Sequence, residues 1–164
     1  MSTAAVERFN GGICPIDVGD LERVVAIDRA HTGHSRRRFF EKRFTAAKAH
    51  PDDFVQIGLM RGGSLRGFAV ARLLHGEFGH EDIVAVLDVV GVEVESQDRG
   101  VGQRLIEQLI EIMRLKGVRA LHSQAGWASH HLLRFFDAAD FQLSPRMVLD
   151  RSVAEPLAEP MEEP

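Results

Sequence analysis

A valine-rich run that leads straight into a helix-patterned segment is the feature that most constrains the fold of this chain. The run Ile83–Val94 is typical of a strand buried on both faces. From Val101 to Met113, apolar residues recur at steps of three and four, and Gly117 follows where a helix C-cap belongs. A buried strand followed by an amphipathic helix predicts a sheet that is covered by helices.

The remaining pattern adds further strands and helices on both sides of this unit. The run Arg61-Gly-Gly-Ser64 predicts a hairpin turn, because glycines tolerate positive φ. Helices are predicted to begin after the capping residues Asp17, Ser35 and Ser129. Further strands are predicted at Ile13–Ile16, Phe54–Met60, Leu65–Leu74, Ala120–Gly126 and Met147–Asp150. The order β-α-α-β-β-β-α-β-α-β predicts an α/β fold, a mixed sheet with helices on both faces.

The length of 164 residues suits one domain, which we place at residues 1–152. Residues 153–164 combine prolines with four glutamates and no basic residue, so we expect a disordered acidic tail. The chain has 24 acidic and 20 basic residues, and the four tail glutamates account for the whole excess. The body of the protein is therefore neutral.

Composition argues against several classes of partner and location. A neutral body whose longest basic run is Arg36–Arg38 gives little support for nucleic-acid binding. The N-terminal residues contain no apolar stretch long enough for a signal or membrane segment. One cysteine, Cys14, excludes an internal disulfide and fits a reducing compartment. We therefore expect a cytoplasmic protein with neither nucleic acid nor membrane as a partner.

Two glycines open the helix-patterned segment, in the sequence Gln97-x-x-Gly100-x-Gly102. The first backbone N–H groups of a helix lack intrahelical partners, and with the helix dipole they form an anion site. Glycines let a pyrophosphate approach such a backbone closely. The alternative is that Gly100 and Gly102 only permit a tight turn.

Two other phosphate-binding loops are excluded by the same residues. A P-loop needs a Gly-Lys pair, which occurs nowhere in the chain. A dinucleotide fingerprint needs a third glycine or alanine three residues after Gly102, and that position is Leu105.

The stretch Gln97-x-x-Gly100-x-Gly102 after a long strand resembles the acetyl-CoA motif of the GNAT superfamily of N-acetyltransferases, Gln/Arg-x-x-Gly-x-Gly/Ala. The resemblance extends over Ile13–Arg151 in the order of elements. It implies a GNAT-like acyl-CoA N-acyltransferase fold, with a central, mostly antiparallel sheet flanked by helices. It also implies acetyl-CoA as the co-substrate and an amine as the acceptor, without a metal.

The resemblance further implies which residues bind the cofactor. Backbone groups near Val92 and Val94 are expected to pair with the pantetheine arm, and amides from Gln97 to Gly102 to hold the pyrophosphate. Ser129 stands where family members often have an asparagine. The expected cofactor-binding residues are therefore Val92, Val94, Gln97, Asp98, Arg99, Gly100, Val101, Gly102 and Ser129.

The C-terminal half departs from the family pattern. Phe136 stands where many members have the tyrosine that protonates the departing thiolate, and Asp140 stands in a glycine position. The chain contains no tyrosine at all. We expect Phe136 to serve packing, in an enzyme that tolerates the absence of the acid, because an ordinary thiol has a pKa of about 8.5 and leaves readily.

Asp88 is the candidate general base, because a carboxylate inside a buried strand needs a reason to be there. Side-chain alternation is expected to put Asp88, Val90 and Val92 on one face and Glu93 on the other. The alternative is a structural carboxylate that holds a loop or an arginine. The eight histidines show no metal-ligand spacing and are expected in surface or packing roles, and Trp127 is expected to pack a strand end.

These observations favour direct transfer of an acetyl group from acetyl-CoA to a primary amine of a small molecule or a protein. A backbone N–H at a splay in the strand near Val92 is the expected oxyanion donor. Two alternatives remain open, a non-catalytic acyl-CoA-binding sensor or structural module and, with less support, a nucleotide-phosphate enzyme. A homodimer is also left open.

Overall fold

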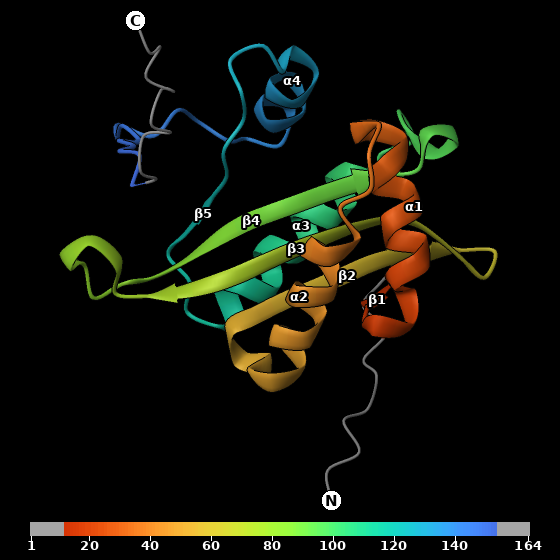
Figure 1. Ribbon diagram of the computed structural model, residues 1–164, viewed down its shortest axis with the longest axis horizontal. Coiled ribbons are helices and arrows are strands. Elements are labelled where there is room, and N and C mark those ends of the chain that lie inside the picture. The colour runs from red at the N-terminus through yellow and green to blue at the C-terminus, as the bar shows by residue number, and fades with distance from the viewer. Residues whose placement is uncertain (1–11, 154–164) are drawn as a thin grey trace, which may run out of the picture.

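The computed structural model describes residues 12–153, which form one five-stranded sheet in the order β1-β2-β3-β4-β5. The strands are β1 (Ile13–Pro15), β2 (Phe54–Arg61), β3 (Ser64–His75), β4 (Ile83–Val92) and β5 (Ala120–His122). The first four pair antiparallel to their neighbours, and β5 pairs parallel to β4 (Figure 1). The sheet is therefore mixed and mostly antiparallel, as the sequence predicts.

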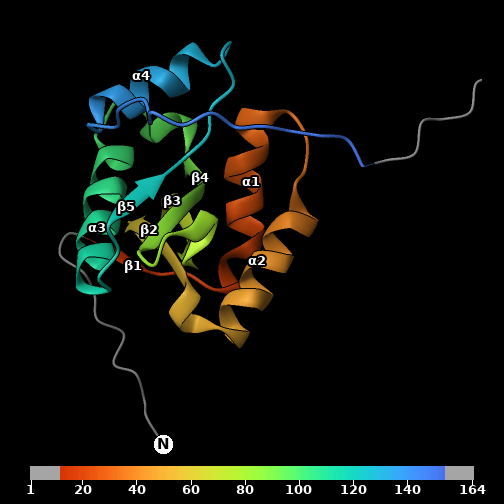
Figure 2. The same cartoon turned by 90° about the vertical axis from the view of Figure 1, so that its left-hand side faces the viewer.

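Helices lie on both sides of the sheet (Figure 2). Helices α1 (Leu21–Thr32) and α2 (Arg37–Ala49) lie on one face. Helices α3 (Val101–Leu115) and α4 (His130–Ala138) lie on the other, where α3 makes the crossover from β4 to β5. None of the helices within residues 12–153 is long and apolar enough to cross a membrane.

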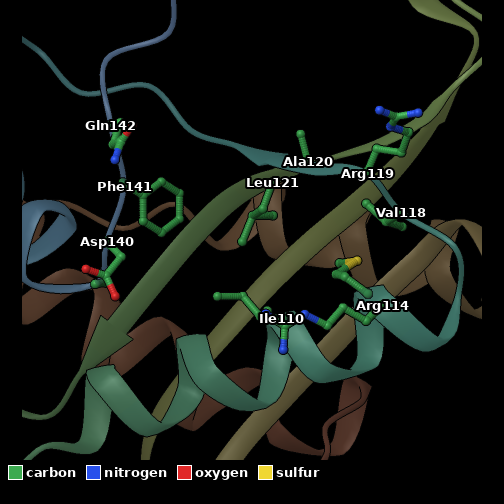
Figure 3. A pocket seen from close by; sticks show the side chains of 11 residues that line it. Ile110, Arg114, Val118, Arg119, Ala120, Leu121, Asp140, Phe141 and Gln142 are labelled. Carbon is green, nitrogen blue, oxygen red and sulfur yellow. The ribbon is translucent and has the colours of Figure 1, made fainter.

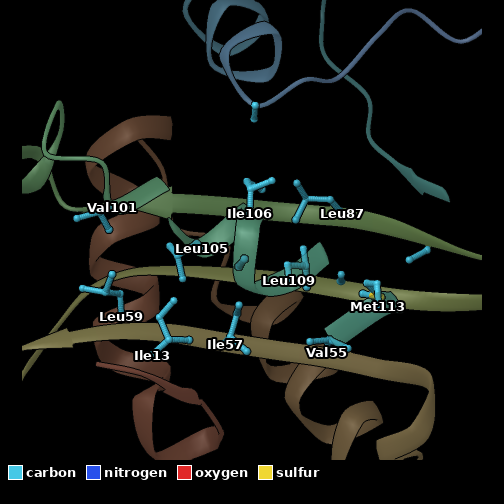
Figure 4. Close-up of a cluster of buried hydrophobic side chains, with 14 of the residues drawn as sticks. Ile13, Val55, Ile57, Leu59, Leu87, Val101, Leu105, Ile106, Leu109 and Met113 are labelled. Carbon is cyan, nitrogen blue, oxygen red and sulfur yellow. The ribbon is translucent and has the colours of Figure 1, made fainter. Parts of the chain in front are cut away.

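Each face of the sheet has its own apolar core. The core on the α3 face, seen in Figure 4, gathers inward side chains of β1 to β4 with the stripe of α3, and the partly buried Leu121 of β5 packs against it. It includes Ile57, Leu87, Leu105, Leu109 and Met113. The core on the other face, which includes Val24, Ile27, Phe40, Phe68 and Val89, packs α1 and α2 against the sheet. The apolar periodicity of the sequence thus finds a partner on both sides.

Local signals fix several ends of these elements. The Asp17 side chain accepts the Gly19 N–H at 2.7 Å and begins a short 3₁₀ turn that leads into α1. Gly62 and Gly63 both have positive φ in the β2–β3 hairpin. Ser35 is displaced by one position from the N-cap of α2, which is Arg36, although its Oγ lies 3.4 Å from the Arg37 nitrogen.

Two predictions about the C-terminal third are wrong. Strand β5 ends at His122 instead of Gly126, and Met147–Asp150 is irregular rather than a strand. Met147 and Leu149 are 87% and 86% exposed. A short strand is stable only when it pairs with a neighbour and buries one face. Residues 147–150 do neither, so their local pattern is not sufficient. The acidic tail predicted at residues 153–164 lies outside the described residues, apart from Val153.

Candidate active site

Strand β4 has an open edge beyond its contact with β5. The two strands pair only over Val84–Val86, and the Ser123 hydroxyl then donates to the Leu87 carbonyl at 3.2 Å. Further along, the Glu93 N–H donates to the Arg66 carbonyl on β3 at 2.8 Å. Because backbone groups alternate between the two edges of a strand, those of Val92 face the opposite, open edge. The expected splay is present, and it begins before Val92.

A bulge in β4 changes which side chains share a face. Val70 pairs with Val89, but Ala71 pairs with Leu87, so Asp88 is the extra residue. Leu87 consequently packs in the core on the α3 face, whereas Val89 packs in the core on the other. Asp88 faces α2, while Val90 and Val92 pack on the α3 side. The prediction that Asp88 shares a face with Val90 and Val92 is wrong, because the bulge breaks the alternation.

Asp88 lies between two arginines. Its carboxylate is 2.8 Å from Nε of Arg43 on α2 and accepts Nε–H of Arg72 on β3 at 3.1 Å. This is the arrangement that the alternative, a structural carboxylate holding an arginine, anticipates. A catalytic role for Asp88 stays a prediction.

Glu93, the residue after β4, is held in a second arrangement of the same kind. It accepts hydrogen bonds from Arg66 at 2.7 Å, from the Ser96 hydroxyl at 3.0 Å and from Arg23 of α1. The Arg66 hydrogen bond is the largest cause that lowers the pKa of Glu93 to about 2. Desolvation opposes it, and Ser96 and Arg23 lower the pKa further. Glu93 therefore anchors the loop that leaves β4.

The loop between β4 and α3 ends at a helix terminus with no side-chain cap. Gly100 is the N-cap of α3 and has φ +72°. As a glycine it has no side chain that could accept a hydrogen bond from the first N–H groups of the helix. A Cβ at Gly100 would meet nothing within 4 Å, so the space beside this backbone is open. The first-turn N–H groups of α3 need an external partner. A negatively charged group such as a phosphate fits here by charge and by space.

Gly102 has a structural reason for being glycine in addition to the one inferred from the sequence. A Cβ at this position would lie 2.7 Å from Cε2 of Phe135 and 3.5 Å from Cγ2 of Val92. Gly102 is buried and lets α4 pack closely against the start of α3. The second glycine thus permits close packing between helices, which the motif does not reveal, and its cofactor-binding role stays a prediction.

The remaining expected cofactor-binding residues lie along one continuous segment, apart from Ser129. Val94 begins a short 3₁₀ turn, Val94–Ser96, and is more than half exposed. Gln97 is half-buried, Asp98 and Arg99 are exposed, and Val101 is buried at the start of α3. Ser129 occupies the N-cap position of α4 but makes no side-chain capping bond. Val92 to Gly102 therefore form one continuous segment from the end of β4 to the start of α3, whereas Ser129 lies at the start of α4.

The aromatic residues near α4 divide into buried and exposed ones. Phe136 is buried in the core on the α3 face, with ring centroids 5.6 Å from Phe135 and 4.8 Å from Phe141. Its packing role is the one expected from the sequence. Trp127 is 90% exposed, so the prediction that it packs a strand end is wrong. The loop that carries it has left the sheet after β5.

His31 is a residue of this region that sequence reasoning missed. It lies in the last turn of α1, and its Nε2 is 2.5 Å from the Val92 carbonyl oxygen. A carbonyl only accepts, so Nε2 carries the proton and donates. Only the packing of α1 on β4 brings these positions together, and no sequence spacing signals it.

A groove of about 350 Å³ lies elsewhere, between the C-terminal half of α3, strand β5 and residues 139–142 (Figure 3). Ile110, Met113, Leu121 and Phe141 line it together with Arg114 and Asp140. It is far along α3 from Gly100 and includes none of the expected site residues. Within residues 12–153, no group of three or more His, Cys, Asp or Glu side chains could hold a metal ion.

The fold and this loop define a class. Solved acetyltransferases share this fold, a mixed sheet whose fourth strand here opens along one edge and runs into an uncapped, glycine-led helix. The family model described as "Acetyltransferase (GNAT) family" matches residues 21–141. The chain belongs to the GNAT acetyltransferase family.

Solved structures of low sequence identity share the fold. A transcriptional regulator from Bacillus halodurans C-125 superposes with a TM-score of 0.73 at 17% identity, over 85% of this chain and 98% of that one. The aminoglycoside 6'-N-acetyltransferase AAC(6')-IG from Acinetobacter haemolyticus gives 0.72 at 14% identity, over 87% and 99%. AAC(6')-Iy, in complex with a bisubstrate analogue of CoA and acetylneamine, gives 0.69 at 22% identity, over 87% and 97%. No curated protein matches the chain by sequence.

Proposed function

We propose that the protein transfers an acetyl group from acetyl-CoA to a primary amine of a small molecule or a protein. The observation that carries this proposal is the continuous path from the open edge of β4 to the uncapped start of α3. Family membership supports it, and so does the CoA-containing ligand of AAC(6')-Iy.

The chain would hold acetyl-CoA mainly through its backbone. Val92, whose carbonyl on the open edge of β4 keeps a second lone pair beside the His31 bond, and Val94 after it would pair with the amides of the pantetheine arm. N–H groups from Asp98 to Gly102 would face the pyrophosphate, with the exposed Arg99 beside them, whereas the Gln97 N–H donates to the Val94 carbonyl at 3.3 Å. Ser129 would contact the cofactor from the start of α4. Bound in this way, acetyl-CoA supplies a thioester next to β4.

The protein's part in the reaction is to orient the two reactants and stabilise charge. The amine nitrogen forms a bond to the acetyl carbonyl carbon, the C–S bond breaks, and the amine loses one proton. That proton, by way of a base or water, balances the thiolate that leaves as CoA thiol. A backbone N–H on the open edge near Val92 would stabilise negative charge on the carbonyl oxygen.

Thermal stability and enzyme turnover test the proposal together. Acetyl-CoA at 100 times its dissociation constant adds about 2.7 kcal/mol, which should raise Tm by roughly 5–10 °C for a chain of this size. A screen of amines, in which a thiol-reactive dye detects released CoA, then tests turnover. The absence of a Tm shift at millimolar acetyl-CoA would overturn the proposal.

A charge reversal tests the loop assignment. Arg99→Glu puts a negative charge beside the expected pyrophosphate and should weaken CoA binding about tenfold at low salt, less at high salt. Arg61→Glu, an exposed position on the β2–β3 hairpin, makes the same change of net charge and is the control. The single tryptophan, Trp127, offers a fluorescence signal for the titration. Equal affinities of the two variants would contradict the assignment.

A non-catalytic acyl-CoA-binding module is the second candidate function. The absence of every tyrosine from the chain favours it, because the usual proton donor of the family is missing. Acetyl-CoA binding without release of CoA in the presence of any amine would support this candidate.

A further inference from the structure

Between the sheet and the helices α1 and α2, five arginines pair with three carboxylates in three separate groups. We call this set the arginine cluster; it comprises Arg23, Arg36, Arg43, Arg66 and Arg72, paired with Asp28, Asp88 and Glu93. Glu93 and Asp88 each pair with two arginines, so each of these two groups has a formal excess of one positive charge. The cluster draws its members from α1, α2, β3 and β4 and therefore exists only in the folded chain.

The carboxylates and the arginines of the cluster differ in their exposure to solvent. The three carboxylate side chains are 4–13% exposed, whereas the five arginine side chains are 27–38% exposed. A molecule that approaches this face therefore meets guanidinium groups, with the compensating carboxylates beneath them. Arg43 and Arg36 are also oriented by Phe39, whose ring centroid lies 5.0 Å and 5.6 Å from their Cζ atoms.

The pair Arg43 and Arg72 is disposed to bind an anion. Both meet Asp88 through Nε, and no hydrogen bond within residues 12–153 uses their terminal Nη groups. The Nη groups form the fork that binds a carboxylate or a phosphate in two-point fashion. Because Asp88 already holds both arginines in place, little side-chain freedom is lost when a ligand binds.

The position of this fork relates it to the proposed reaction. Asp88 is at the bulge of β4, and the open edge follows at Val90 and Val92. Val90 and Val92 are two and four residues from Asp88, which is about 7 Å and about 13 Å along a strand. A ligand whose anionic group meets Arg43 and Arg72 can therefore place a second group, several bonds away, at the open edge. Helices α3 and α4 lie on the opposite face of the sheet (Figure 2).

We propose that the acceptor is an amine that also carries an anionic group, a carboxylate or a phosphate, and that Arg43 and Arg72 bind this group. The inference rests on the proposed acetyl transfer and names its class of substrate. Polycationic acceptors are disfavoured by repulsion from the arginine cluster. The proposed acceptor is therefore not an aminoglycoside, the class that appears in the names of several structural neighbours.

Matched pairs of amines test the substrate class with the wild-type protein. Hexylamine is compared with 6-aminohexanoate, and glucosamine with glucosamine 6-phosphate; neamine serves as the polycation. We expect kcat/KM to be at least tenfold higher for the anionic member of one pair, with a KM that rises with salt. The pair that responds distinguishes carboxylate from phosphate.

Variants of Arg72 test the assigned residues. Arg72→Gln should raise KM for the anionic amine at least tenfold, and by clearly less for its neutral partner. Arg72→Lys keeps the charge but not the two-point guanidinium geometry, so its KM for the anionic amine should lie between those of wild type and Arg72→Gln. Arg61→Gln on the hairpin is the control. If Arg72→Gln fails to fold, the wild-type comparison still decides the substrate class.

The outcomes separate the two proposals. If acetyl-CoA produces no Tm shift, the proposed function itself is overturned. A Tm shift with equal or higher kcat/KM for neutral amines or neamine overturns only the anionic acceptor, as does a failure to turn over any anionic amine. Anionic preference that survives Arg72→Gln unchanged overturns the assignment of the fork.

Discussion

At the scale of single residues, Glu93 couples the stability of the fold to pH. Its folded-state pKa is lowered from 4.5 to about 2, first by the hydrogen bond from Arg66. A lowered pKa means that ionised Glu93 stabilises the folded protein above about pH 4.5. This contribution is lost as the pH falls from about 4.5 towards 2.

Glu93→Gln should therefore lower Tm at pH 7, and the difference from wild type should shrink as the pH falls through this window. Tm measured by scanning calorimetry between pH 7 and pH 2.5 checks the prediction. Glu95→Gln, an exposed position two residues further on, is the matched control. A difference between wild type and Glu93→Gln that stays constant with pH would contradict it.

Phe136 permits a second test at this scale. Phe136→Tyr restores the residue type common in the family but introduces a hydroxyl into an apolar core. An unpaired buried hydroxyl costs about 1–3 kcal/mol, and we expect a loss of this size in denaturant unfolding. Turnover should rise less than tenfold, because a thiolate leaves without full protonation near neutral pH. A hundredfold gain in turnover would show that the native protein lacks a needed acid.

At the scale of elements, the end of α4 explains a departure from the family pattern. Asp140 follows the C-cap Ala139 and has φ +60°, the left-handed conformation that favours glycine. The Phe141 N–H bonds the Phe136 carbonyl at 2.9 Å, and the two rings are in contact. This is a Schellman ending with its apolar contact. Asp140 fills the conformational role of the family's glycine, since a short polar side chain tolerates this region.

Asp140→Gly should accordingly leave stability unchanged or raise it by up to about 1 kcal/mol, whereas Asp140→Val should lower it by about 1–2 kcal/mol. Urea unfolding of both variants measures these changes. The Asp140 side chain is exposed, so lost packing does not obscure the comparison. Equal stability of the Gly and Val variants would show that the backbone of residue 140 is not left-handed in solution.

At the scale of the whole molecule, the C-terminal segment contributes little to the described core. Val153 is 95% exposed, and Leu143, Met147 and Leu149 are also exposed. A protein that ends at Arg151 should therefore keep its Tm within about 2 °C and its affinity for CoA. Thermal melts with and without CoA check both points. A larger loss would mean that the C-terminal residues pack against the domain.

The sequence determined those features that depend on residues close together in the chain. The doubly buried strand, the loop that leads to Gly100, the hairpin at Gly62 and the amphipathic α3 all follow from local periodicity and backbone preference. These signals also suffice for the family. Local pattern failed at Met147–Asp150, because a strand needs a partner that no local sequence supplies.

Tertiary structure alone decided which side chains contact one another at the site. The bulge turns Asp88 away from the face of Val90, and contact with Phe135 explains Gly102. The packing of α1 brings His31 to Val92, and α2 brings Arg43 to Asp88. Each of these contacts joins residues that are distant in sequence, and their energies depend on distance and burial in the folded chain. No spacing in the sequence encodes them.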